Sequence, residues 1–420
     1  MILNWLITVP RRLVMVGLRP VVALRPASRQ MALALFLWGI GEGLWIFVRP
    51  LYVAELGGNP AQAGQVLAAA GLAPMLLMLP SGRIIDRFGP RMVLVVNWWI
   101  GTVSAVLLAL APGWEWLFLG FFMYSVSASA IPAIDVYVAR DVYQDSGTGS
   151  VESRDMQAAI AVVFAAYFAG TILSPLVGGW LGETLGLRNV FWFSAVWFLF
   201  STLVVQAMPS LPDYHHVEHP ASHESQRAWW QFTPAQRRVY ATLLTIFFFV
   251  ALGYALIPSY LEIRRGLTFG ILGALGSATA IGGMVWMLVL GRFHSRVAIG
   301  LAALLLAVAF AGVLLTPAGG WLVPAMVGVY FLLGIYLTIR TLALQVASEY
   351  TPPQQHGTAF GMVETMFGVG AFVGPWAAGL LFTAAPEWPF LVAAIALVPL
   401  AGAAWWLLRP PGAVIPPKSK

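Results

Sequence analysis

The stretch GRIIDRFGPRMVL, residues 82–94, begins where an apolar segment at residues 61–81 ends and runs into the next one at residues 91–111. It gathers three arginines and one aspartate around Gly89 and Pro90. Apolar segments of about 20 residues can cross the hydrocarbon of a bilayer, and arginines gather in the loops that face the cytoplasm. The stretch therefore predicts a tight cytoplasmic loop between two membrane-spanning helices.

The composition also indicates a membrane protein. Of the 420 residues, 60% are hydrophobic and 10% are charged, whereas a soluble domain carries about 25% charged residues. The net charge of +6 does not indicate a nucleic-acid partner, because the basic residues are scattered between apolar segments and act as topology signals. The absence of cysteine excludes disulfides and thiolate metal sites, and we expect no cofactor.

Twelve apolar segments follow the N-terminal region. If the spans alternate in direction, most of the 23 Lys and Arg residues fall on one side, which places both termini in the cytoplasm of a multi-pass protein of the cytoplasmic membrane. The predicted spans are residues 31–54, 61–81, 91–111, 116–140, 156–181, 189–208, 239–262, 267–290, 297–316, 321–346, 357–383 and 389–408.

One long polar stretch divides the chain into two halves. Its histidines are interpreted as part of a solvated linker; a transition-metal site is the alternative, because His219 and His223 would share a face of a helix. The predicted divisions are a basic juxtamembrane segment at 1–30, a six-helix bundle at 31–208, a cytoplasmic linker at 209–238, a second six-helix bundle at 239–408 and a cytoplasmic tail at 409–420.

The two halves repeat each other. The matches are RPLY at 49–52 with IPSY at 257–260, DRFGPR at 86–91 with GRFHSR at 291–296, and GTILSPLVGG at 170–179 with GAFVGPWAAG at 370–379. Their order is kept while the offset shrinks from 208 to 205 and 200 residues, which indicates duplication rather than chance. We therefore predict an all-α integral membrane protein whose twelve transmembrane helices form two pseudo-symmetric six-helix bundles, with the substrate site between them.

The loop quoted above resembles the loop motif of the major facilitator superfamily. The residues that carry the resemblance are Gly82, Asp86, Arg87, Gly89 and Arg91, while Pro90 stands where the family often has a basic residue. We expect Gly82 to allow two helices to approach closely and Gly89 to allow a tight turn. Asp86 is expected to accept hydrogen bonds from the arginines and a helix N-terminus, and so to hold the cytoplasmic side shut in one state; a purely structural turn is the alternative.

The fifth span resembles the glycine–proline motif of the same superfamily, which is associated with proton-coupled antiporters that export drugs. Ser174 stands where that motif usually has glycine. Glycines allow close helix packing, and proline removes a backbone donor, so a packing role without any bearing on transport direction is the alternative. The predicted packing residues of the fifth and eleventh spans are Gly170, Pro175, Gly178, Gly179, Gly370, Gly374, Pro375 and Gly379.

Charges inside apolar spans point to the transport pathway, because each costs about 2.5–3.5 kcal/mol at a bilayer centre. Glu42 lies about 16 Å along the first helix, near mid-bilayer, and shares a helix face with Arg49. No partner is predicted for it at its own depth. Glu42 is therefore our candidate proton-coupling carboxylate, on a helix that Gly39, Gly41 and Gly43 are expected to loosen; a structural tie to Arg49 is the alternative.

Three further charged residues lie about 10 Å from the cytoplasmic ends of their spans, and so form one layer: Asp135, Arg340 and Glu364. They are candidates for proton coupling and for the substrate pathway. Alternatively, Asp135 pairs with Arg87 or Arg91 at the cytoplasmic gate, and Arg340 and Glu364 form a static ion pair. Aromatic residues such as Tyr254 also lie along the expected pathway, although most tryptophans are interpreted as packing or interfacial residues.

The resemblance implies a secondary active transporter, in which two bundles rock around a central site, driven by the proton gradient. It favours export of drug-like or amphipathic solutes. Uptake of a sugar, amino acid or organic anion is the near alternative, and a non-transporting receptor or assembly factor with this fold is the alternative from another class. We expect no enzyme, because the spans lack a His cluster or a Ser/Lys dyad. The expected partners are a small-molecule substrate, protons and the lipid bilayer, around a monomer.

Overall fold

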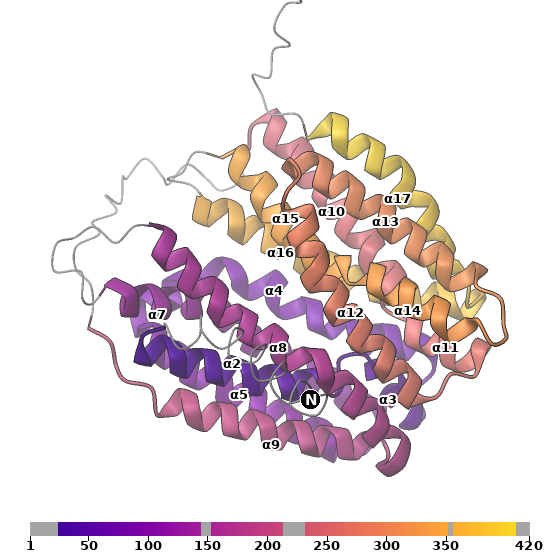
Figure 1. The fold of residues 1–420 in the computed structure, drawn as a ribbon, viewed down its shortest axis with the longest axis horizontal. Helices are drawn as coiled ribbons and strands as arrows, with labels where there is room; N and C mark the ends of the chain where they lie inside the picture. Colours follow the sequence, from indigo (N-terminus) through magenta and orange to yellow (C-terminus); the bar gives the residue numbers. More distant parts are fainter. Residues whose placement is uncertain (1–23, 144–152, 213–231, 352–355, 409–420) are drawn as a thin grey trace, which may run out of the picture.

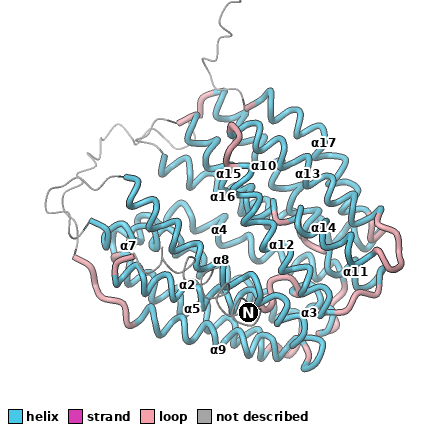
Figure 2. Tube along the Cα trace, viewed as in Figure 1, coloured by secondary structure: helices cyan, strands magenta, loops and turns pink. Residues whose placement is uncertain are grey.

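The computed structural model of the protein describes residues 24–143, 153–212, 232–351 and 356–408, and all regular structure in these ranges is helical (Figure 2). The two halves lie side by side, with the first half below and the second above in Figure 1. The first half contains α2 (Pro26–Gly43), α3 (Arg49–Glu55), α4 (Pro60–Phe88), α5 (Pro90–Leu110), α6 (Trp114–Ser127), η1 (Ala128–Ala130), α7 (Ile131–Tyr143), α8 (Ser153–Leu185) and α9 (Leu187–Gln206).

The second half follows the same order. It contains α10 (Pro234–Tyr254), α11 (Ile257–Arg265), α12 (Phe269–Leu290), α13 (Ser295–Leu315), α14 (Leu322–Leu333), α15 (Ile335–Glu349), α16 (His356–Ala384) and α17 (Trp388–Leu407). We call the end where α9 ends and α10 begins the linker end, and the opposite end the far end. The His-rich part of the predicted linker and the N-terminal basic segment up to residue 23 lie outside the described residues.

Local sequence explains where α4 and α10 begin. Asn59 and Gln62 cap α4 reciprocally, each side chain accepting from the other residue's backbone N–H, and Thr233 and Gln236 do the same for α10. In each helix a proline follows the cap, at a position where its missing N–H has no helical partner to lose.

Within the described residues, eleven helices are long and apolar enough to cross a membrane. The exception is the first predicted span, residues 31–54, which is split into α2 and α3 by a turn. Pro50 explains the break, because it cannot donate to the carbonyl of Ile46 as a continuous helix requires. Together with the all-helical architecture, this arrangement confirms the predicted fold class.

Interrupted spans occur at equivalent places in the two halves. The first and seventh spans break between α2 and α3 and between α10 and α11, and the fourth and tenth break at η1 and at Gly334. Interrupted helices at the interface of repeated halves are typical of transporter binding sites. The breaks therefore direct attention to the centre of the molecule.

The halves pack on each other through α4 against α16 and α8 against α12. At these contacts a β-carbon on Gly64 would meet the backbone of Pro375 and Gly379, and one on Gly179 would meet the backbone of Gly273. These residues lie in the parts of their helices away from the linker end. The far end is therefore closed by backbone-to-backbone packing.

Candidate functional site

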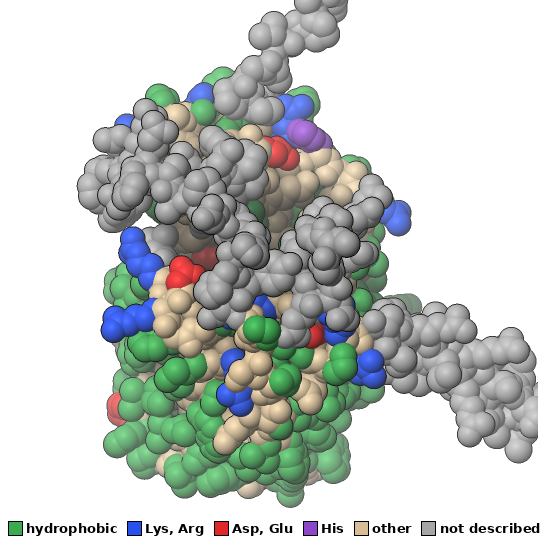
Figure 3. Space-filling view, turned by 90° about the vertical axis from the view of Figure 1, so that its left-hand side faces the viewer, with side chains coloured by type: hydrophobic (Ala, Val, Ile, Leu, Met, Phe, Trp, Pro, Cys, Tyr) green, Lys and Arg blue, Asp and Glu red, His purple; other side chains and the backbone are tan. Residues whose placement is uncertain are grey.

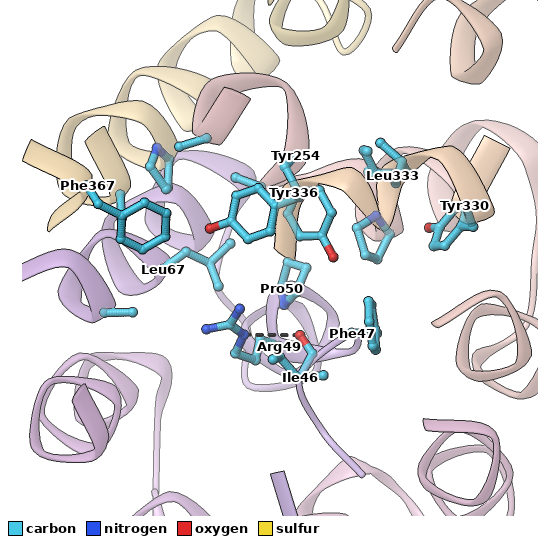
Figure 4. Close-up of a pocket in the computed structure, with 17 residues that line it drawn as sticks. Ile46, Phe47, Arg49, Pro50, Leu67, Tyr254, Tyr330, Leu333, Tyr336 and Phe367 are labelled. Carbon is cyan, nitrogen blue, oxygen red and sulfur yellow. Dashed lines mark hydrogen bonds between the residues drawn. The ribbon is translucent and has the colours of Figure 1, made fainter. Parts of the chain in front are cut away.

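A cavity lies between the halves, with a volume of about 150 Å³ (Figure 4). Both halves contribute to its walls, through the interrupted spans and through α4 and α16. The lining residues that the argument below uses are Phe47, Arg49, Tyr254, Tyr330, Tyr336 and Phe367.

The cavity lies on the pseudo-symmetry axis of the duplication. Four pairs of residues related by the offset of 208 both line it: Ile46 with Tyr254, Phe47 with Ala255, Arg49 with Ile257, and Pro50 with Pro258. The two helix breaks therefore face each other across the cavity. The lining is apolar and aromatic on both sides, and among the described residues only the first half places a charged side chain in it.

That charged residue is Arg49, at the start of α3. Its Nε donates a 3.1 Å hydrogen bond to the carbonyl of Ile46. Pro50, which has no N–H, cannot donate to this carbonyl. The guanidinium also lies 5.7 Å from the centre of the Trp45 ring. The helix break thus positions Arg49, and the arginine in turn satisfies the carbonyl that the break leaves free.

Aromatic side chains of the second half form the opposite wall. The rings of Tyr254 and Tyr336 stack with their centres 4.3 Å apart and their planes 6° from parallel. The ring centre of Phe367 lies 6.3 Å from that of Tyr336, and the Arg340 guanidinium lies 5.7 Å from the Phe367 ring centre. The hydroxyl of Tyr330 is buried and has no hydrogen-bond partner among the described residues. A planar, amphipathic solute would match such a wall.

Glu42 lies inside the first half and is not among the residues that line the cavity. Tyr167 on α8 donates a 2.7 Å hydrogen bond to Oε2 of Glu42, and the Tyr124 hydroxyl on α6 is also within hydrogen-bonding range of the carboxyl group. The expectation that Glu42 lacks a partner at its own depth is therefore wrong. The sequence could not show this contact, because the partners are about 80 and 125 residues away along the chain.

The glycines around Glu42 do not loosen α2, which corrects a second expectation. A β-carbon on Gly39 would meet the Tyr167 carbonyl, one on Gly41 would meet the Phe198 ring, and one on Gly43 would meet Ser174. The missing side chains bring α2 close to α8 and α9. The same close approach brings the Tyr167 hydroxyl to the carboxyl group.

Arg340 and Glu364 form an ion pair, with Nε and Oε1 2.7 Å apart. Asp135 belongs to the other half, and the Arg340 charge acts on it across the interface. Oδ1 of Asp135 and Oε2 of Glu364 are buried and accept no hydrogen bond from described residues. The alternative that Asp135 pairs with Arg87 or Arg91 is wrong for this state, because Arg91 bonds to the carbonyls of Gln206 and Met208 instead.

The loop motif lies at the linker end. Gly89 has a φ of 76°, which glycine adopts without strain, so the tight turn is present. Gly82 is exposed and a β-carbon there would meet nothing, so the expected close helix approach at Gly82 is wrong. Asp86 is exposed and forms no hydrogen bond with described residues, while Arg87 lies over the Phe88 ring. In this state Arg91 hydrogen-bonds the loop to the end of α9 and the residues just after it.

The glycine–proline motifs have equivalent surroundings in the two halves. Gly170 and Gly178 approach α2, and Gly370 and Gly374 approach α10, within the same half. The last glycine of each motif, Gly179 or Gly379, approaches α12 or α4 of the other half. Pro175 lies beside Gly276 at the same interface, and Pro375 lines the cavity.

The family model described as Major Facilitator Superfamily matches residues 31–342 and 303–420. The chain belongs to the major facilitator superfamily.

Relatives of this superfamily are similar over most of the chain. Multidrug resistance protein 1 of Bacillus subtilis (strain 168) is 24% identical, over 86% of this chain and 91% of that protein. Among solved structures, the nucleoside transporter NupG superposes with a TM-score of 0.73 at 16% identity, over 92% of this chain and 100% of that chain. A bacterial homologue of the human lysosomal transporter Spinster, inward-facing and unoccupied, has a TM-score of 0.68 at 14% identity, over 91% and 96% of the two chains. The chain is thus a transporter rather than an enzyme.

Several residues of the site were not predicted from the sequence. Tyr167, Tyr330, Tyr336 and Phe367 were not singled out, because aromatic residues are common in every span. The 208-residue offset could have indicated the cavity. It aligns Tyr254 with Ile46, and each of these residues lies four positions before a proline of the repeat. The alternative metal site of the linker falls outside the described residues, and no group of three or more metal-ligating side chains occurs within them.

Proposed function

We propose that the chain carries an amphipathic, aromatic solute across the cytoplasmic membrane by alternating access, with proton movement coupled at Glu42. The observation that carries this proposal is the cavity between the halves, whose walls come from both bundles. A site of this kind can face either side if one bundle rocks against the other. The described state is closed at the far end, where α4 packs on α16 and α8 packs on α12.

Glu42 supports proton coupling through its position. It is a carboxyl group inside a membrane-spanning bundle, held by Tyr167 and close to Tyr124. These hydroxyls come from helices other than α2, so a shift of α2 against α8 changes the surroundings of the carboxyl group. Such a group can bind a proton differently in the two states.

The charge distribution supports a cytoplasmic linker end. Figure 3 looks onto this end and shows arginine side chains gathered on it, whereas hydrophobic side chains cover the lower flank. By the positive-inside rule, both termini then lie in the cytoplasm. The proposal is for a functional monomer, since one chain supplies every described wall of the cavity.

Two directions of transport remain open to test. Export is favoured by the relative named Multidrug resistance protein 1, and exchange for protons is the coupling proposed with it. Uptake together with protons is the alternative, and Arg49 in the cavity suits an organic anion in either direction. The two differ in the sign of linkage: in exchange, solute and proton compete for the carrier, whereas in cotransport they bind together.

Flux in proteoliposomes tests the proposal. Purified protein is reconstituted, a pH gradient of either sign is imposed, and uptake of a panel of labelled amphipathic solutes is measured. We expect accumulation of at least one solute that collapses when a protonophore is added. A folded, correctly inserted protein that moves no solute of the panel under either gradient would contradict a carrier function and favour a receptor with the same fold.

A further inference from the structure

Arg49 is the one charged side chain among the described residues that line the cavity, and we propose that the cavity binds an aromatic organic anion. The anionic group would lie at the Arg49 guanidinium and the ring against Tyr254, Tyr336 and Phe367. This inference rests on the carrier function proposed above and names the substrate class of the same site.

The duplication shows that the fold does not need an arginine here. The second half makes the same helix break after α10, with a proline in the same place, and carries Ile257 where the first half carries Arg49. Both residues line the cavity from facing breaks. Because an isoleucine suffices on one side, the charge on the other side calls for an explanation beyond the shape of the helix.

The guanidinium remains available to a ligand. Only its Nε is used within the described chain, in the bond to the Ile46 carbonyl. No described carboxylate lies within ion-pair distance of it. Glu42 acts on Arg49 electrostatically but is hydrogen-bonded by Tyr167, and Glu364 is taken by Arg340. A half-buried cation without a paired carboxylate favours an anionic ligand, and two terminal N–H groups suit a carboxylate, sulfonate or phosphate.

The opposite wall offers a surface for a ring. The stacked pair of Tyr254 and Tyr336 and the ring of Phe367 come from α10, α15 and α16, and all face the cavity (Figure 4). Tyr330 adds a second, independent observation, because it is only 3% exposed and its hydroxyl lacks a partner among the described residues. A buried hydroxyl of this kind indicates a missing partner, such as a second polar group of the solute.

Binding of three probes that share one ring system tests the inference. The probes are 2-naphthoate, 2-naphthylmethanol and 2-naphthylmethylammonium, which carry a negative, a zero and a positive charge. Their affinities are measured by calorimetry on the purified full-length protein in detergent. We expect 2-naphthoate to bind at least about tenfold more tightly than the ammonium probe, as the loss of one charge-assisted hydrogen bond implies.

Substitutions at Arg49 locate the effect. Arg49→Leu is expected to weaken 2-naphthoate binding by about tenfold or more and to abolish the preference among the probes, whereas Arg49→Lys keeps the charge and part of the preference. Arg49→Gln is a second neutral variant, whose amide can still reach the Ile46 carbonyl if the leucine variant does not fold. The matched control is Arg264→Gln, which removes an exposed arginine outside the cavity and should leave the three affinities unchanged.

The outcomes separate this inference from the carrier function. Equal or tighter binding of the ammonium probe, or unchanged 2-naphthoate binding in both neutral variants, would overturn the anion assignment. If such a protein still accumulates a neutral or cationic solute in proteoliposomes, the carrier function stands and only the substrate class is wrong. If 2-naphthoate binds in an Arg49-dependent way but no solute moves under a pH gradient, the site is right and the carrier function is wrong.

Discussion

The Tyr167 hydroxyl on α8 donates a 2.7 Å hydrogen bond to Oε2 of Glu42 on α2. Gly39 makes this contact possible, because any side chain there would meet the Tyr167 carbonyl. The pair therefore ties the one carboxyl group of the first helix to a helix that also packs on α12 of the other half. Motion between the halves can therefore reach Glu42, the proposed proton site, through α8.

We predict that Glu42→Gln separates binding from coupling. The amide mimics the neutral carboxyl group, so substrate binding should persist and lose its pH dependence, while gradient-driven accumulation stops. Exchange of solute down its own gradient should remain. Counterflow and pH-driven uptake in proteoliposomes measure the two activities. Tyr167→Phe is the matched control, because it keeps the carboxyl group and should alter the pH profile without removing it. Full accumulation by Glu42→Gln would make Glu42 structural and leave Asp135 or Glu364 as candidates.

We predict that Asp86→Asn preserves insertion and thermal stability but slows transport. Asp86 is exposed and forms no described hydrogen bond in the state with the far end closed, so the substitution should not affect this state. Its charge is proposed to act when the linker end closes. Initial transport rates and melting temperature are measured together, with Glu115→Gln at the far end as control. Transport at the parent rate would show that the loop is only a turn.

We predict that reporters fused within the linker at 209–238 face the cytoplasm. The expectation follows from the arginines that flank the linker end, including Arg91 and Arg237, compared with the few at the far end. A fusion in the far-end loop after α5, near Pro112, provides the opposite orientation as a control. A periplasmic signal from the linker fusion would invert the whole topology, including the side that the loop motif is proposed to close.

We predict that Gly179→Val opens the far end. Its side chain would meet the backbone of Phe269 and Gly273 across the interface, and such overpacking costs about 1–3 kcal/mol. The population should therefore shift toward the state in which α8 and α12 separate. Because the chain lacks cysteine, a single Ala70→Cys in the cavity wall reports the shift through labelling by a membrane-impermeant thiol reagent from the far side. Gly402→Ala, where a β-carbon meets nothing, should leave labelling unchanged.

We predict that the ion pair in the loop before α17 makes a small contribution to the stability of the protein, and that acid removes this contribution. Arg264 donates to Glu387, and this bond holds the pKa of the glutamate below its ordinary value of 4.5. Because this pKa is lowered in the folded state, the ion pair stabilises the protein at pH values above the ordinary pKa of the glutamate. That stabilisation is lost as the pH falls through the lowered pKa. The effect is small because the pair is exposed. Melting curves of the parent and Glu387→Gln should differ at neutral pH and converge in acid. A constant difference at all pH values would rule out the ion pair as its cause.

The sequence alone was sufficient to predict the membrane class, the duplicated halves and the all-helical architecture. These features depend on composition and on apolar length, which are local properties of the chain. The repeat of 49–52 at 257–260 aligned the two prolines, but the predicted spans 31–54 and 239–262 ran through them, and the structure shows that both spans break there. The ion pair of Arg340 with Glu364 could also be predicted as an alternative, because both residues lie at one depth on consecutive spans.

Only the tertiary structure decided which side chains meet. Tyr167 reaches Glu42 because three glycines bring α2 close to its neighbours, and a sequence does not show which helices a glycine approaches. Likewise, the numbering relates Arg49 to Ile257, but only the folded halves place both residues on one cavity. Helix formation follows from hydrogen bonds within a segment, whereas the site depends on long-range packing between segments, which local pattern does not specify.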